Sequence, residues 1–77
     1  MSLFEGIKGN HYEIRGLGAE EAVTRRLQAL GLNHGTVVTV LNRKRGGALI
    51  IRVRGTRLAL GRRICQGIEV EEWTDEA

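Results

Sequence analysis

Residues 19–41 contain a complete helix, the stop of that helix and the start of a strand, and this stretch constrains the fold more than any other. The helix has one apolar face, formed by side chains that recur at helical spacing: Val23, Leu27 and Leu30. Gly31 follows them, and glycine readily adopts the left-handed conformation that ends a helix. Leu32 is then placed to pack back onto the helix. We therefore predict a helix from Ala19 to Leu30 whose end is fixed in the core.

Strand signals surround this helix. After Gly35 the chain enters a run of β-branched residues, and short alternating or apolar segments occur elsewhere. The five predicted strands are 11–17, 36–41, 48–54, 58–60 and 68–72. Residues 61–67 fit a single helical turn, with Ile64 and Cys65 packed under the sheet. Five short strands with one helix after the first are most economically satisfied by a strongly bent antiparallel sheet that closes into a small barrel.

A loop signal at Asn42–Gly47 joins the second and third predicted strands. Hairpin pairing around this loop places Val40 opposite Leu49 and Val38 opposite Ile51, which gathers the branched apolar residues on one face. We expect this face to line the core.

A second turn joins the third and fourth predicted strands. Gly55 and Thr56 form a two-residue turn with glycine first, which is the type II′ preference. The resulting pairs are Val53 with Leu58 and Ile51 with Leu60 on the inner face, and Arg54 with Arg57 and Arg52 with Ala59 on the outer face. Like charges directly opposite one another cost a strand pair a few tenths to about 1 kcal/mol, and an acidic partner would relieve this cost.

The 77 residues are expected to form one domain, because a second core could not be built from so short a chain. Residues 1–10 are punctuated by glycine, and we expect a loop against the sheet with Leu3, Phe4 and Ile7 available to pack. Residues 73–77 form a polar, acidic tail that is expected to fray.

The charge and the single cysteine limit the class of protein. A net charge of +3 favours acidic partners without requiring nucleic acid. Cys65 has no second cysteine with which to form an intramolecular disulfide, and a lone thiol is typical of a reducing compartment. No segment is apolar for long enough to cross a bilayer, and residues 1–12 lack the apolar centre of a signal peptide. We expect a cytoplasmic location and no membrane insertion.

Two motifs resemble the family of ferrous iron transport protein A, and the resemblance extends over residues 3–72. The first motif is Leu30-Gly31-Leu32-x-x-Gly35-Thr36, and the second is Gly55-x-Arg57-Leu58-Ala59-Leu60. The resemblance implies an SH3-like barrel in the cytosol, accessory to a membrane ferrous-iron transporter that carries its own GTP-binding domain. The residues that carry this resemblance are structural: Leu27, Leu30, Gly31, Leu32, Gly35, Gly55, Leu58 and Leu60. Many members have proline at the position of His34 and in the turn at residues 43–47, so partner contacts cannot be transferred there.

Neither catalysis nor metal binding is predicted. The chain has no recognisable catalytic constellation and no phosphate-cradling motif, so we expect a protein that is not an enzyme and has no cofactor. Residue types that can bind metal are present but scattered: His11, His34, Cys65, Glu69, Glu71 and Glu72. None of them forms a local pair at ligand spacing, and we therefore predict no metal site.

The candidate site is basic. It combines the outer face of the predicted hairpin with the nearby loop: Arg52, Arg54, Arg57, Arg43, Lys44 and Arg45. Such residues can form a solvated surface, a protein-docking site or a phosphate-binding site, but RNA platforms usually add exposed aromatic residues. Our leading hypothesis is a module, monomeric or weakly homo-oligomeric, that binds the cytosolic part of the transporter. A small nucleic-acid-binding barrel and an iron-sensing module are the alternatives.

Overall fold

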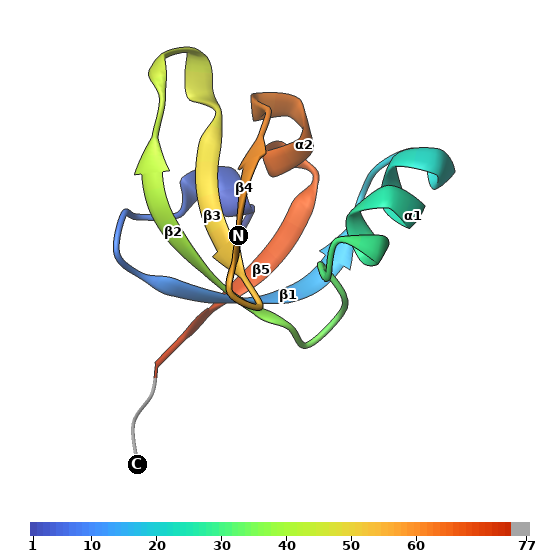
Figure 1. Ribbon diagram of the computed structural model, residues 1–77, viewed down its shortest axis with the longest axis horizontal. Helices are drawn as coiled ribbons and strands as arrows, with labels where there is room; N and C mark the ends of the chain where they lie inside the picture. Colours follow the sequence, from blue (N-terminus) through green and yellow to red (C-terminus); the bar gives the residue numbers. More distant parts are fainter. Residues whose placement is uncertain (75–77) are drawn as a thin grey trace.

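The computed structural model describes residues 1–74, and the other three residues of the expected tail lie outside the described residues. The strands are β1 (His11–Leu17), β2 (Val37–Arg43), β3 (Leu49–Val53), β4 (Thr56–Leu60) and β5 (Ile68–Trp73). The helices are α1 (Glu21–Ala29) and α2 (Arg62–Gln66), with 3-10 turns η1 (Leu3–Glu5) and η2 (Arg45–Gly47) (Figure 1). Each predicted strand is present, and the predicted helical turn corresponds to α2.

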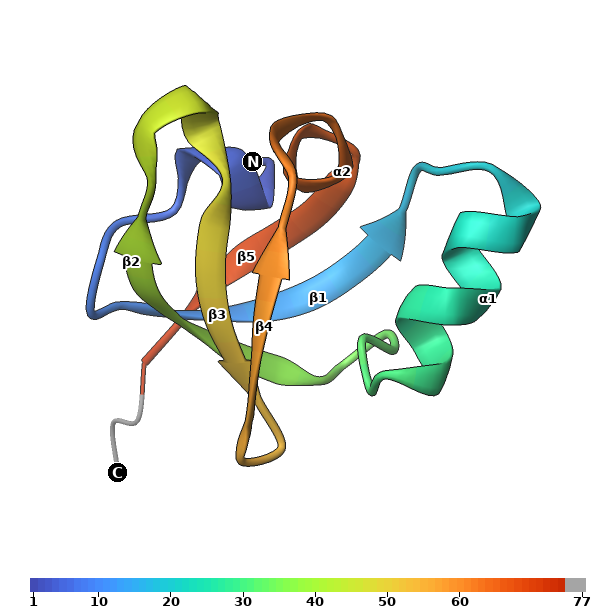
Figure 2. The same ribbon diagram turned by 45° about the horizontal axis from the view of Figure 1, so that its top comes forward.

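The strands form one antiparallel sheet in the order β4-β3-β2-β1-β5, with α1 inserted after the first strand. The sheet is strongly bent, so that β1 and β5 cross behind β3 and β4 (Figure 2). The prediction of a small, mainly β barrel of five antiparallel strands with one inserted helix is therefore confirmed.

The core lies inside the bend of the sheet and is mostly aliphatic. Its buried residues are Leu3, Tyr12, Ile14, Leu27, Leu32, Val38, Val40, Leu49, Ile51, Val53, Leu60, Cys65, Ile68 and Val70. Tyr12 is the aromatic member, and its hydroxyl oxygen accepts a 2.7 Å hydrogen bond from the Ile7 N–H. This bond satisfies the phenol where it would otherwise be buried without a partner.

The end of α1 follows the predicted design. Gly31 has a φ of +105°, its N–H donates to the Gln28 carbonyl, and the Leu32 N–H donates 2.9 Å to the Leu27 carbonyl. These two bonds form a Schellman motif, and both leucines belong to the core. Gly35 (φ +88°) then directs the chain into β2.

The predicted apolar face of α1 is wider than the face that is buried. Leu27 is the helix residue that is fully buried, Val23 is half-buried, and Leu30 is 44% exposed, so the expectation that Leu30 packs in the core is wrong. Figure 1 shows that α1 stands beside the barrel instead of lying across it, so only part of its apolar face meets the core. The helix is also shorter at both ends than predicted, because it spans residues 21–29.

The register of the first hairpin differs from the prediction by two residues. Val40 lies opposite Ile51, and Val38 lies opposite Val53. Two successive left-handed glycines, Gly46 and Gly47, make the loop tighter than predicted, and β2 therefore continues to Arg43 with a bulge between residues 40 and 42. A slip of two residues keeps every side chain on its own face, which is why the buried face was correct although the pairing was wrong.

The second hairpin also shifts by two residues. Its turn is centred on Arg54 (φ +51°) and Gly55 (φ +80°), not on Gly55 and Thr56. Positive φ at both central positions defines a type I′ turn, whose twist matches that of the flanking strands. Arg52 consequently lies opposite Arg57, and the predicted pairing of Arg54 with Arg57 is wrong.

The first residues of the chain and Trp73 are more ordered than the sequence predicted. Leu3 is fully buried at the start of η1, and Ser2 forms a bridge with Glu69 of β5. Ile7, expected to pack, is 61% exposed. Trp73, assigned to a frayed tail, is the last residue of β5, and its ring meets the His11 ring edge-on at 5.9 Å.

Candidate functional site

Two arginines lie side by side on the outer face of the β3–β4 hairpin. Arg52 and Arg57 are directly opposite in the observed register, and both are exposed. Within residues 1–74, neither forms an ion pair with a carboxylate. The like-charge pair inferred from the sequence is thus present, although with Arg52 in place of Arg54. It costs the fold a small amount that an acidic partner would remove.

Arg54 has a separate structural role. It occupies the left-handed region that glycine normally fills, and its side chain lies over Gly31 at the end of α1. A Cβ built on Gly31 would come within 3.3 Å of the Arg54 Cδ, and the φ of +105° at this position favours glycine. A cation beside the last turn of a helix also interacts favourably with the helix dipole. Arg54 therefore lies beside the end of α1 as well as on the basic surface.

The basic loop lies at the opposite end of the hairpin, so the prediction that it adjoins the β3–β4 turn is wrong. β3 separates the two groups, with a rise of about 3.3 Å for each of its residues, and Figure 2 places the η2 loop and the β3–β4 turn at opposite ends of the strands. The predicted site is therefore two basic groups, one formed by Arg52, Arg54 and Arg57, and one around η2. We call the first group, together with the outer face of β3 and β4, the hairpin surface.

Arg43 has a structural role, unlike the two cations that follow it in the loop. Its guanidinium donates hydrogen bonds of 2.6 Å to the Phe4 carbonyl and 2.9 Å to the Gly6 carbonyl. The guanidinium carbons of Arg43 and Arg62 also lie 4.9 and 5.1 Å from the centre of the Phe4 ring. Lys44 and Arg45 are exposed. Of the three cations predicted in this loop, two are therefore available to a partner without breaking a contact of the fold.

The distribution of charge along the chain is a signal that the sequence reasoning missed. All nine acidic residues lie outside residues 22–68, and ten of the twelve lysines and arginines lie within them. The fold therefore has a basic side and an acidic side. β2, β3, β4 and α2 all come from the basic segment, residues 22–68, while β5 comes from the acidic segment that follows it. A count of charges along the sequence would have identified the basic side.

Several carboxylates on the acidic side form ion pairs within the molecule. Arg15 on β1 forms ion pairs with Glu13 at 3.3 Å and with Glu71 on β5 at 3.2 Å. The amino group of Met1 lies 2.8 Å from a Glu69 carboxylate oxygen. Glu13, Glu69 and Glu71 are thus paired with cations within the molecule, in contrast to the arginines of the hairpin surface.

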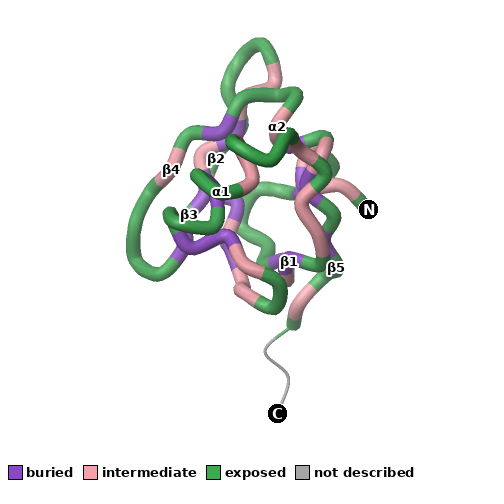
Figure 3. Tube along the Cα trace, turned by 90° about the vertical axis from the view of Figure 1, so that its right-hand side faces the viewer, coloured by how far each residue is buried: buried purple, intermediate pink, exposed green. Residues whose placement is uncertain are grey.

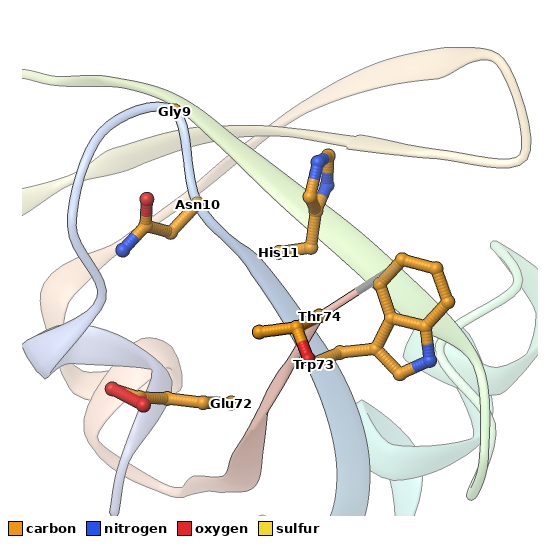
Figure 4. A pocket seen from close by; sticks show the side chains of 6 residues that line it. All are labelled: Gly9, Asn10, His11, Glu72, Trp73 and Thr74. Carbon is orange, nitrogen blue, oxygen red and sulfur yellow. The ribbon is translucent and has the colours of Figure 1, made fainter. Parts of the chain in front are cut away.

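An open hollow of about 320 Å³ lies at the end of β1 and β5. It is lined by Gly9, Asn10, His11, Glu72, Trp73 and Thr74. Figure 4 shows Asn10 and Glu72 on one side of this hollow and the His11 and Trp73 rings on the other. His11 Nδ1 is 2.7 Å from the Thr39 hydroxyl, which orients the imidazole. The hollow has no lysine or arginine in its lining, and Thr39 lies between His11 and Arg52 of the hairpin surface in the strand register.

The candidate metal ligands remain scattered in space. Across residues 1–74, no three side chains of His, Cys, Asp or Glu are grouped so that they could hold a metal ion. Cys65 is fully buried on α2, and burial raises the pKa of its thiol. It is a core residue, as predicted from its apolar neighbours. None of the helices among the described residues combines the length and the apolar character needed to span a bilayer.

Comparison with known proteins identifies a family. The model of the FeoA domain matches residues 1–72. The solution structure of the FeoA protein from Chlorobium tepidum is 32% identical, with a TM-score of 0.91, and the match covers all of this chain and 74% of that one. A crystal structure described as the iron uptake regulatory protein FeoA is 25% identical, with a TM-score of 0.84, and the match covers 95% of this chain and 96% of that one. The comparison with curated proteins gave no match.

Another solved structure bears on the type of barrel. Stenotrophomonas maltophilia FeoA, crystallised with zinc, was described as a procaryotic SH3 domain protein and proposed as a bacterial ferrous iron transport activating factor. It is 26% identical, with a TM-score of 0.80, and the match covers 92% of this chain and 89% of that one. A manganese-dependent transcriptional repressor is 19% identical, and the match covers 95% of this chain and 41% of that one. At this identity the similarity shows a shared fold and nothing about function. The SH3-like barrel expected from the resemblance is therefore confirmed.

Proposed function

The chain belongs to the FeoA family, and from this premise we propose that it is a non-enzymatic accessory protein of ferrous iron uptake that binds the cytosolic, GTP-binding part of a membrane Fe(II) transporter. In this role it would act in the cytoplasm. The hairpin surface is the binding site, and the partner presents an acidic patch.

The observation that carries this proposal is the unneutralised charge of the hairpin surface. Arg52 and Arg57 are adjacent, exposed and without a carboxylate partner among the described residues, whereas Arg15 on the other side of the sheet has two. Complementary charge across an interface steers encounter and selects the partner. An acidic protein surface would remove the repulsion between the two arginines at the moment of binding.

The aromatic residues argue against a nucleic-acid platform. Single strands are bound by bases that stack on exposed aromatic side chains among cations. Here Tyr12 is buried, Phe4 is covered by two arginines, and Trp73 lies beside Glu72 on the acidic side. The basic segment, residues 22–68, contains no phenylalanine, tyrosine or tryptophan. Protein docking therefore explains the basic surface better than RNA binding does.

Calorimetry with the purified cytosolic domain of the transporter tests the proposal. We expect a one-to-one complex whose affinity falls steadily as salt is raised from about 50 mM to about 500 mM, because exposed charges are screened over this range. A single-stranded RNA of mixed sequence is the competitor. If the chain does not bind the domain, or binds the RNA more tightly than the domain, the proposed function is wrong.

A further inference from the structure

β4 has one free edge. It pairs with β3 on one side, and no described residue supplies a backbone hydrogen bond to its other side. Four of its five residues are exposed or half-exposed, and Figure 3 shows β4 at the rim of the molecule. The opposite edge of the sheet differs, because the Val70 N–H of β5 donates 2.8 Å to the Met1 carbonyl and Ser2 bridges Glu69. A free edge of this kind is a template for another strand.

The type I′ turn determines which groups point outward. The residues that flank a two-residue turn exchange hydrogen bonds, and bonded and non-bonded pairs then alternate along the hairpin. Val53 and Thr56 flank the turn, so Arg57 belongs to a non-bonded pair, as does Ala59. The N–H and C=O groups of these two residues are therefore directed away from β3 and toward solvent.

The side chains on this edge specify what can pair with it. Arg57 stands on the outer face beside Arg52, while Leu58 stands on the inner face and is half-buried against the core. A strand added next to β4 would place alternate residues on these two faces. Acidic residues would then meet the arginines, and an apolar residue would cover the open side of Leu58.

We infer that β4 binds an extended acidic segment of its partner as a sixth strand, with acidic and apolar residues alternating along that segment. The inference rests on the proposed function and specifies how the partner is held. Backbone hydrogen bonds to Arg57 and Ala59 supply affinity, and the arginine pair supplies selectivity. Because Arg57 repels a like charge, the same residue keeps two copies of the chain from pairing through β4.

Two probes test the inference on the intact chain. The first is a short blocked peptide of alternating valine and glutamate, with a peptide of alternating valine and lysine as its control. We expect the glutamate peptide to protect the amides of Arg57 and Ala59 from hydrogen exchange at least tenfold, and the lysine peptide to leave them unchanged. Protection by both peptides equally, or protection in the absence of any peptide at high protein concentration, overturns the inference; the latter result would identify a second copy as the occupant.

The second probe is the transporter's cytosolic domain. Its binding is measured to two variants of this chain that differ at one position, residue 59. Ala59→Pro removes an outward donor without removing a bond to β3, and proline is tolerated on an edge strand. Ala59→Val keeps the donor and is the matched control. We expect the proline variant to bind at least tenfold more weakly and the valine variant to bind within about threefold of wild type.

The outcomes separate the two proposals. If the wild-type chain does not bind the domain, the proposed function fails, and the peptide experiment still decides whether β4 accepts an acidic strand. If the domain binds the proline and valine variants equally well and the amides of Arg57 and Ala59 exchange as fast in the complex as in the free chain, the edge is not used and the inference is overturned. A proline variant that does not fold leaves the exchange measurement on wild type to give the answer.

Discussion

The two edges of the five-stranded sheet are opposites in charge and in pairing. At the β5 edge, Glu69 and Glu71 find cations within the molecule, and the first residues of the chain cover the backbone. At the β4 edge, Arg52 and Arg57 face each other without a carboxylate in the part of the chain that is described, and the backbone is open.

This difference separates structure from recognition. Edge strands are a liability, and proteins protect them with charge or by covering them. The β5 edge uses both devices and is closed, whereas the β4 edge uses charge alone. The arginines would repel a basic strand and attract an acidic one. The contrast thus explains why a small barrel would keep one edge unpaired.

The largest expected effect is a difference in stability between a substitution in β5 and a substitution in β4. Ile68 of β5 is 1% exposed, and Leu58 of β4 is half-buried. We expect Ile68→Ala to reduce the free energy of unfolding by about 2–5 kcal/mol and Leu58→Ala by about 1–2 kcal/mol, because less apolar surface is returned to water at β4. Urea denaturation measures both values.

Equal losses in the two variants would contradict the contrast. They would mean that β4 is packed as tightly as β5, and that Leu58 has no open side for a partner to cover.

Much of the fold could be predicted from the sequence, and the rest depends on turn geometry. Alternation placed the strands and their buried faces correctly, because the side-chain period is a local property. The pairing register was wrong by two residues in both hairpins, since it depends on whether Arg54 accepts a left-handed φ and on how tightly Gly46 and Gly47 turn. A non-glycine residue at positive φ is uncommon, and the sequence pattern therefore favoured the other turn.

The site was predicted in composition but not in arrangement. A like-charge pair on the hairpin is present as predicted, but Arg54 was given the place that Arg52 holds, and the choice of the hairpin arginines as a binding site stays a prediction. The contacts of Arg43 with Phe4 and Gly6 join residues that are 39 and 37 positions apart, and no local pattern marks such contacts. Leu30 was assigned to the core because periodicity gives a helix face but not the depth to which it is covered.

A smaller effect distinguishes the structural cation from its neighbours near η2. Arg43→Ala removes two hydrogen bonds to carbonyls and the contact with Phe4, and we expect it to cost about 1–2 kcal/mol of stability. Arg45→Ala, at an exposed position two residues away, is the matched control and should change stability by less than about 0.5 kcal/mol. Thermal and urea unfolding of the two variants measure this difference. Equal stabilities would mean that the Arg43 contacts contribute nothing and that all three cations are free.

The most direct test of the account compares two double charge reversals in binding to the transporter's cytosolic domain. Arg52→Glu with Arg57→Glu reverses the hairpin surface, and Lys8→Glu with Arg26→Glu reverses two exposed cations elsewhere and changes the net charge by the same amount. We predict that the hairpin variant binds at least tenfold more weakly, while the control stays within about threefold of wild type. Equal loss in both variants, or a larger loss in the control, would contradict the account, because docking would then depend on total charge or on α1.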